Sequence, residues 1–124
     1  MAGEENLEKT KRAYAAFSSG DAEGAMQDLA DDIEWITPGK SAISGTVRGK
    51  QEVGALWGKF LEQGFKTSPQ YWFADDERVV VLTRVTVAGE EADEADVLTF
   101  RDGKVVRFQS ASDTALLERV YGSQ

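Results

Sequence analysis

The chain has 124 residues, of which 22 are acidic and 14 basic, and its formal net charge is −8. This charge argues against nucleic acid or an anionic membrane as a partner. The chain has no cysteine and no histidine, which excludes disulfides, thiolate catalysis and histidine bases and removes the commonest transition-metal ligand. We expect any acid–base chemistry to depend on carboxylates, tyrosines or lysines, without a cofactor.

Length and composition predict one domain over residues 1–124. The hydrophobic fraction of 41% is ordinary for a globular protein. No apolar run approaches the length of a membrane span. The first residues lack the basic and apolar regions of a signal peptide. We therefore expect a cytoplasmic location.

The first half of the chain predicts helices and one strand. Apolar residues at helical spacing indicate an amphipathic helix from about Glu4 to Ser18. Asp21 is expected to cap a second helix that continues to Leu29. Residues Ile33–Thr37 are typical of a short strand, and a loop is predicted from Lys40 to Arg48.

The pattern then changes from helix to strands. An apolar stripe from Val53 to Leu61 predicts a helix. Two strands are predicted at Thr67–Ala74 and Arg78–Ala88, followed by a long hairpin between Glu94 and Ser110. A short helix is predicted at Asp113–Tyr121. Helices first and strands later favour an α+β fold, with helices packed on one side of a mostly antiparallel sheet.

The hairpin carries a carboxylate, Asp96, among apolar residues. A two-residue turn at Asp102-Gly103 would place Asp96 opposite Gln109 and mix charged and apolar side chains on each face. A three-residue loop with a left-handed Gly103 would instead create a bulge and place Asp96 opposite Phe108. The second register is preferred because it separates the two residue types. It predicts an inward face of Asp96, Leu98, Phe100, Val106, Phe108 and Ser110.

Several segments of the chain have a recognisable pattern in common with a known family. They are Tyr14–Phe17 with Gly20-Asp21, Leu29–Trp35 with Pro38-Gly39, Gly49 with Val53, and Phe100–Val105. Together they resemble the SnoaL-like group of the nuclear transport factor 2-like superfamily. The resemblance spans nearly the whole chain and implies a cone, in which a strongly curved sheet wraps around helices and encloses a pocket. Members include ketosteroid isomerases, polyketide cyclases, epoxide hydrolases, dehydratases and binders without catalysis, so fold alone does not set function.

The resemblance allows the active-site positions of ketosteroid isomerases to be compared with this chain. Asp96 matches the protonated acid with which these enzymes stabilise an oxyanion, an acid of raised pKa in an apolar site. Their general base falls on Thr37. Their oxyanion tyrosine falls on Ala13, one position from Tyr14, so the steroid isomerase reaction itself is not expected. Trp57 falls on another tyrosine of their active site.

Two other catalytic sets of the group are also incomplete. Polyketide cyclases have a histidine where this chain has Asp96 and an aspartate near Ser110. Epoxide hydrolases need an Arg-x-Asp pair, for which this chain has Arg84-Val85-Thr86, and an aspartate where Ser110 stands.

Asp96 is the candidate catalytic residue, as an acid or a base whose pKa is raised by burial. The alternative is a structural acid hydrogen-bonded to Ser110, Gln109 or water. The candidate substrate-binding residues form an aromatic and apolar wall with hydroxyl groups that orient the ligand. They are Tyr14, Phe17, Trp35, Thr37, Trp57, Phe60, Thr83, Leu98, Phe108, Ser110 and Ser112.

Other acidic residues have simpler interpretations. Asp113 is expected to cap the final helix. The acidic run Glu90, Glu91, Asp93 and Glu94 is expected to be solvated, and no metal site is predicted. The outer sheet face is too apolar for full exposure, which favours a homodimer; it would comprise Val80, Leu82, Thr86, Val97, Thr99 and Val105.

The sequence therefore leads to one main functional hypothesis and two alternatives. The main hypothesis is a cofactor-free isomerase, cyclase or dehydratase that acts on a hydrophobic carbonyl or polycyclic substrate by enolisation. The first alternative is a non-catalytic protein that binds a small hydrophobic molecule. The second is a dimerisation domain without a ligand.

Overall fold

The structure is a computed structural model that describes residues 2–124, and Met1 lies outside the described residues. Helices form most of the first half and strands most of the second, as predicted. The elements are α1 (Ala2–Ser18), α2 (Ala22–Met26), β1 (Leu29–Thr37), β2 (Gly45–Arg48), α3 (Gly49–Glu62), β3 (Lys66–Ala74), β4 (Arg78–Val87), β5 (Glu90–Arg101), β6 (Lys104–Ala111) and α4 (Thr114–Tyr121).

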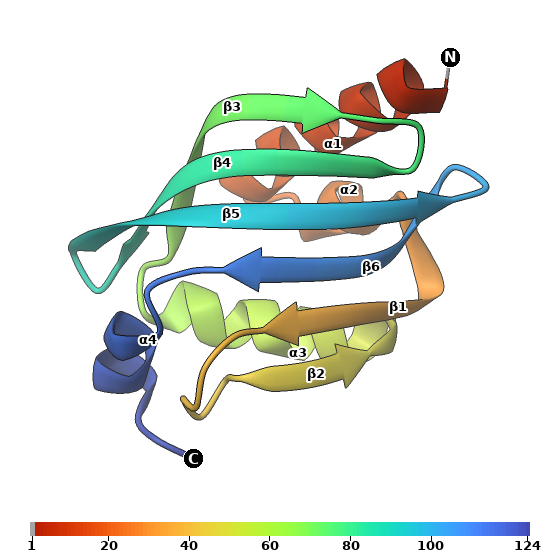
Figure 1. Cartoon of the computed structure of the whole chain (residues 1–124). Coiled ribbons are helices and arrows are strands. Elements are labelled where there is room, and N and C mark those ends of the chain that lie inside the picture. The colour runs from red at the N-terminus through yellow and green to blue at the C-terminus, as the bar shows by residue number, and fades with distance from the viewer. Residues whose placement is uncertain (1) are drawn as a thin grey trace.

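Within residues 2–124, the six strands form one sheet in the order β2-β1-β6-β5-β4-β3. Every neighbouring pair is antiparallel except β1 and β6, which run parallel. Helices α1, α2 and α3 lie behind the sheet in Figure 1, and α4 lies at one end. Register shifts in three of the strand pairs mark the bulges that help a sheet to bend. This confirms the α+β fold with a curved sheet around helices.

The core lies between the helices and the concave face of the sheet. Helix α3 buries Val53, Leu56, Trp57 and Phe60, which recur at helical spacing. Strand β4 buries every second residue, as expected for a strand with one face on the core. The helices and the sheet therefore share one continuous apolar cluster.

Two predicted boundaries are wrong. Leu29 begins strand β1 instead of ending the second helix, which stops at Met26. The predicted loop from Lys40 to Arg48 contains β2, which pairs antiparallel with the end of β1. Strand β2 has only four residues and no buried face, so no hydrophobic alternation marks it in the sequence.

The predicted register of the long hairpin is also wrong in detail. Asp102 and Gly103 both have positive φ angles, 51° and 78°, which is the two-residue type I′ turn that matches strand twist. The bulge lies beyond the turn, between the pairs Phe100–Val105 and Thr99–Arg107. It restores the inward direction of the apolar residues that the two-residue turn alone would have reversed.

The inward position of Asp96 is confirmed despite this shift. Its side chain is 2% exposed, and it lies opposite Ser110 instead of Phe108. Val105 points into the core at 3% exposure, in the role predicted for Val106. Val105 therefore does not belong to the outer face of the sheet.

No helix among residues 2–124 is long and apolar enough to cross a membrane.

Candidate active site

A cavity of about 100 Å³ opens between the helices and the concave face of the sheet. For comparison, one water needs roughly 10–15 Å³ and a cavity of about 150 Å³ can hold benzene. The interior is thus not filled by side chains. It is lined by Ala13, Tyr14, Phe17, Ala25, Leu29, Trp35, Thr37, Ile43, Trp57, Phe60, Phe65, Thr67, Glu94, Asp96, Leu98, Phe108, Ser110, Leu117 and Tyr121.

Aromatic rings form one wall of this cavity. Trp35 on β1 stacks on Phe108 of β6, with ring centroids 3.6 Å apart and planes inclined by 10°. Trp57 of α3 meets Trp35 edge to face at 5.6 Å, and Phe17 of α1 meets Trp57 in the same way at 5.3 Å. Such packed rings present a rigid apolar surface to a flat ligand.

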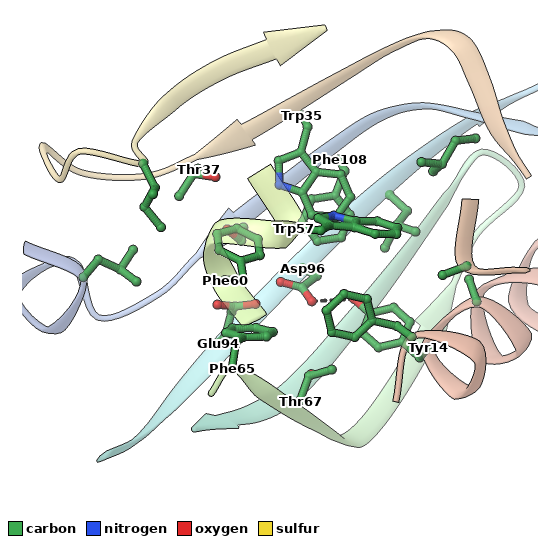
Figure 2. A pocket seen from close by; sticks show the side chains of 18 of the residues that line it. Tyr14, Trp35, Thr37, Trp57, Phe60, Phe65, Thr67, Glu94, Asp96 and Phe108 are labelled. Atoms are coloured by element: carbon green, nitrogen blue, oxygen red, sulfur yellow. Dashed lines mark hydrogen bonds between the residues drawn. The ribbon is translucent and has the colours of Figure 1, made fainter. Parts of the chain in front are cut away.

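Asp96 lies in the interior of the cavity, on the middle of β5. Figure 2 shows its carboxyl group between Tyr14 on one side and Glu94 on the other. The Tyr14 hydroxyl donates a short hydrogen bond to Oδ2 of Asp96. The other oxygen, Oδ1, is buried and receives no hydrogen bond from the described residues.

This environment favours the protonated form of Asp96. Burial raises the pKa of Asp96 well above its ordinary value, and the Glu94 carboxyl group raises it further by charge repulsion. The hydrogen bond from Tyr14 lowers the pKa of Asp96, but this effect is smaller. Asp96 is therefore an acid that retains its proton to a higher pH than an exposed aspartate does.

Glu94 is the second carboxyl group of the cavity. It lies two residues before Asp96 on β5 and opposite the inward-facing Thr83, so the two acids share one face. Burial raises the pKa of Glu94, while the neighbouring polar groups of Asp96 and Ser112 lower it.

Three buried side-chain oxygens have no hydrogen-bond partner within residues 2–124. They are Oδ1 of Asp96, the Oγ1 of Thr37 and the hydroxyl of Tyr121, and all three residues line the same cavity. Burial also raises the pKa of Tyr121 to about 12, so its hydroxyl is a neutral donor. Buried polar groups are normally satisfied, so these atoms define places where a ligand could add hydrogen bonds.

The structure brings most of the predicted binding residues to this cavity. Thr83 and Ser112 do not line it. The hydroxyl of Thr83 lies 2.6 Å from that of Thr67, and Thr67 takes the place on the cavity wall. The predicted residues that line the cavity with Asp96 are Tyr14, Phe17, Trp35, Thr37, Trp57, Phe60, Leu98, Phe108 and Ser110.

The partners of Asp96 are not predicted as such from the sequence. The resemblance aligns Ala13, not Tyr14, with the catalytic tyrosine of the isomerases. In the structure the Tyr14 hydroxyl contacts Asp96, and Ala13 contributes only a methyl group to the cavity wall. Glu94 was expected to be solvated with its acidic neighbours. The alternation that places Asp96 inward also places Glu94 inward, so the sequence did contain this signal.

The remaining acidic residues have structural roles or no common site. Oδ1 of Asp113 accepts a hydrogen bond from the backbone N–H of Leu116 at 3.0 Å, which confirms it as the cap of α4. Within residues 2–124, no group of three or more acidic side chains is arranged to hold a metal ion.

Comparison with known proteins identifies the family. The SnoaL-like domain matches residues 10–108. An uncharacterised protein of Mycobacterium bovis is 38% identical over 58 residues. That match covers 47% of this chain and 44% of the relative, so less than half of the relative's length is matched.

Three solved structures share the fold over almost the whole chain. Bal32a, from a soil-derived mobile gene cassette, has a TM-score of 0.90 at 28% identity, covering 98% of this chain and 99% of that one. A nuclear transport factor 2-like protein of Burkholderia xenovorans has a TM-score of 0.80 at 31% identity, with 98% of each chain covered. TerC, co-crystallised with polyporic acid, has a TM-score of 0.84 at 26% identity, covering 96% and 99%. The chain belongs to the SnoaL-like family of the nuclear transport factor 2-like superfamily.

Proposed function

We propose that this protein binds a small hydrophobic carbonyl compound and converts it, without a cofactor, by enolisation. The reaction would be an isomerisation, cyclisation or dehydration, with Asp96 as the catalytic acid. One observation carries ligand binding: the three buried oxygens without partners, on Asp96, Thr37 and Tyr121, belong to residues that line one cavity. A ligand with an apolar body and oxygen atoms at these places would satisfy them.

The size and walls of the cavity indicate the kind of ligand. A cavity volume of about 100 Å³ suits roughly one aromatic ring, judged against the cavity of ~150 Å³ that holds benzene. A polycyclic substrate would extend beyond this cavity. The rings of Trp35, Trp57 and Phe108 would contact the flat face of the bound group. TerC, co-crystallised with polyporic acid, supports ligand binding by a protein of this fold.

The chemistry rests on Asp96. A buried, protonated carboxyl group can donate a hydrogen bond to a carbonyl oxygen as negative charge develops there. Tyr14 donates its hydrogen bond to Oδ2 of Asp96 and keeps its proton, because burial and Asp96 raise the pKa of Tyr14 well above its ordinary value. Asp96 is thus held in place before the ligand arrives.

Binding and turnover can be tested separately. Phenylacetone and related aryl ketones in D₂O would show α-proton exchange by proton NMR, and Asp96→Asn should abolish it. The control is Asp102→Asn, which changes an exposed acid on the β5–β6 turn. Full exchange by Asp96→Asn would contradict the role of Asp96.

The non-catalytic alternative is favoured by Thr37, a hydroxyl at the family's general-base position, because a hydroxyl without a base partner is a poor proton acceptor. Polyporic acid and the ketones would be titrated by tryptophan fluorescence in a Trp72→Phe background, where the remaining tryptophans, Trp35 and Trp57, line the cavity. Saturable binding without exchange of any ketone would establish this alternative. Absence of binding would leave the ligand-free dimerisation domain.

The outer face of the sheet is the proposed contact with a second copy of the chain. Tyr71 and Phe73 of β3 are 64% and 56% exposed, and Leu82 of β4 is 38% exposed. Tyr71 lies opposite Leu82, and Phe73 opposite Val80, so these side chains form one apolar patch. Pairing two such patches would remove them from water.

A further inference from the structure

We propose that Glu94 is the general base that works with Asp96 as the acid. This inference rests on the proposed carbonyl chemistry and supplies its missing half. The family position for the base holds Thr37, which cannot serve as one.

The inventory of cavity groups leads to Glu94. Among the described residues that line the cavity, the groups that can titrate are Tyr14, Glu94, Asp96 and Tyr121. The two tyrosines are neutral donors, because the pKa of each is raised. Asp96 is 2% exposed and Glu94 only partly buried, so burial favours a proton on Asp96 more than on Glu94. Glu94 is then the carboxylate available to accept a proton from a ligand.

The geometry places the pair correctly. Glu94 and Asp96 are two residues apart on β5, a separation that directs both side chains to one face. Asp96 is held by Tyr14 through Oδ2, and its Oδ1 has no donor. That oxygen is left for a ligand, and Glu94 lines the same cavity.

Asp96 and Glu94 have different surroundings, and we assign them different roles on that basis. Asp96 is 2% exposed, whereas Glu94 is only partly buried and Ser112 has a lowering effect on its pKa. Ser112 therefore favours the ionised form of Glu94, and burial favours the protonated form of Asp96. A pair of groups whose protonation is separated in this way supplies an acid and a base at one pH.

The proposed reaction balances without another reactant. A ketone oxygen accepts a hydrogen bond from protonated Asp96, and the Glu94 carboxylate is ionised. Glu94 removes a proton from the carbon next to the carbonyl, and the C–H electron pair forms the C=C bond of the enolate. The carbonyl π pair moves to the oxygen, where the hydrogen bond from Asp96 stabilises it. Glu94 then returns the proton to the same or another carbon, and the product is an isomer of the substrate.

The first test needs no substrate. Carboxyl groups labelled with ¹³C would be titrated by NMR in the wild-type protein and in Glu94→Gln. Because Glu94 raises the pKa of Asp96, the substitution should lower that pKa. An unchanged Asp96 titration would show that the two groups do not act as a pair and would overturn the inference.

The second test measures α-proton exchange of phenylacetone in D₂O. Glu94→Gln should slow exchange by ~10²–10⁴-fold, the usual contribution of a general base, without weakening ketone binding, and Glu94→Asp should restore part of the rate. The matched control is Glu91→Gln, on the same strand but exposed and bridged to Arg84 at 3.4 Å.

The exchange rate of the wild-type protein should rise with pH through the pKa of Glu94 and fall through the pKa of Asp96. In Glu94→Gln the rise should be lost.

The outcomes separate this inference from the proposed function. Exchange that survives in Glu94→Gln but not in Asp96→Asn would reject Glu94 as the base and leave the carbonyl chemistry standing. No exchange by the wild-type protein with any ketone would reject the carbonyl chemistry, and the catalytic role of Glu94 with it.

Discussion

Asp96 is an ionisable side chain buried at a cost to the folded state. A buried carboxyl group without water must be neutral or be matched by donors. In this chain, Tyr14 supplies one donor, and Glu94 is an acid that adds repulsion. Such an arrangement is typical of functional sites, where stability is given up for a group with an altered pKa.

The raised pKa of Asp96 predicts how stability changes with pH. Below the unfolded-state pKa of roughly 3.9, Asp96 is protonated in both the folded and the unfolded chain. As the pH rises from there to the folded-state pKa, the unfolded chain releases the proton first, so folding stability falls. Asp96→Asn removes this loss of folding stability, since the amide mimics the protonated acid: its oxygen can accept the hydrogen bond from Tyr14, and its N–H can donate one to Glu94.

We therefore expect Asp96→Asn to match the wild-type protein in stability near pH 4 and to exceed it near pH 8. Urea denaturation at both pH values would measure the difference. A wild-type protein that is more stable than Asp96→Asn at pH 8 would show that the Asp96 carboxylate is satisfied when ionised.

The sequence predicted the inward acid but not its neighbours, for physical reasons. Alternation along β5 is local and identifies the face of Asp96. The contact with Tyr14 joins residues 82 positions apart, so it depends on how α1 packs against the sheet. Glu94 follows the same local rule as Asp96, but its place in an acidic run made a solvated position the simpler interpretation.

Helix α4 supplies part of the cavity wall from the far end of the chain. It carries Leu117 and Tyr121, both of which line the cavity. Its start is held by the side chain of Asp113, which satisfies the backbone N–H of Leu116 at 3.0 Å. Because α4 has only eight residues, its position depends strongly on this cap and on its buried face.

Loss of the α4 cap should weaken both folding and binding. We expect Asp113→Ala to lower the free energy of unfolding by about 0.5–2 kcal/mol, the usual effect of losing a side-chain cap. Affinity for a cavity ligand, measured by tryptophan fluorescence, should fall as well, because Tyr121 is less firmly placed. Asp113→Asn retains an oxygen that can accept the same hydrogen bond and should restore both properties. An equal loss in both variants would assign the effect to the charge of Asp113.

The elements that sequence reasoning found are those with a strong periodic pattern. Helix α3 and strand β4 bury residues at spacings that are visible along the chain. Strand β2 lacks such a pattern and forms because it pairs with the end of β1. The bulge at Val105 was misplaced because either turn at Asp102-Gly103 can be reconciled with alternation once a bulge is allowed.

At the scale of the whole molecule, the two faces of the sheet differ in what covers them. The concave face packs on α1 and α3, whereas the front face in Figure 1 carries no helix of the described residues. Tyr71, Phe73 and Leu82 are exposed large hydrophobic side chains on that uncovered face. An isolated chain would keep this apolar patch in water.

We expect the purified protein to be a dimer that Phe73→Glu or Leu82→Glu converts to a monomer. Introducing a charge at the centre of a contact between two copies would leave it buried and unpaired. Sedimentation velocity over a range of concentrations would measure the mass. A matched control is Arg101→Glu, an exposed site next to the β5–β6 turn. A wild-type protein that sediments as a monomer at high concentration would exclude the dimer.

The parallel pair of β1 and β6 has a consequence for how the chain acquires its cavity. Glu34 on β1 lies beside Arg107 on β6, so this strand pair joins early and late parts of the chain. The chain between the two strands must therefore close into a long loop before they can pair. Trp35 meets Phe108 across the same two strands. During synthesis from the N-terminus, β1 is complete long before its partner exists. The aromatic wall is thus assembled in a late folding step, and partly made chains have no place to hold a ligand.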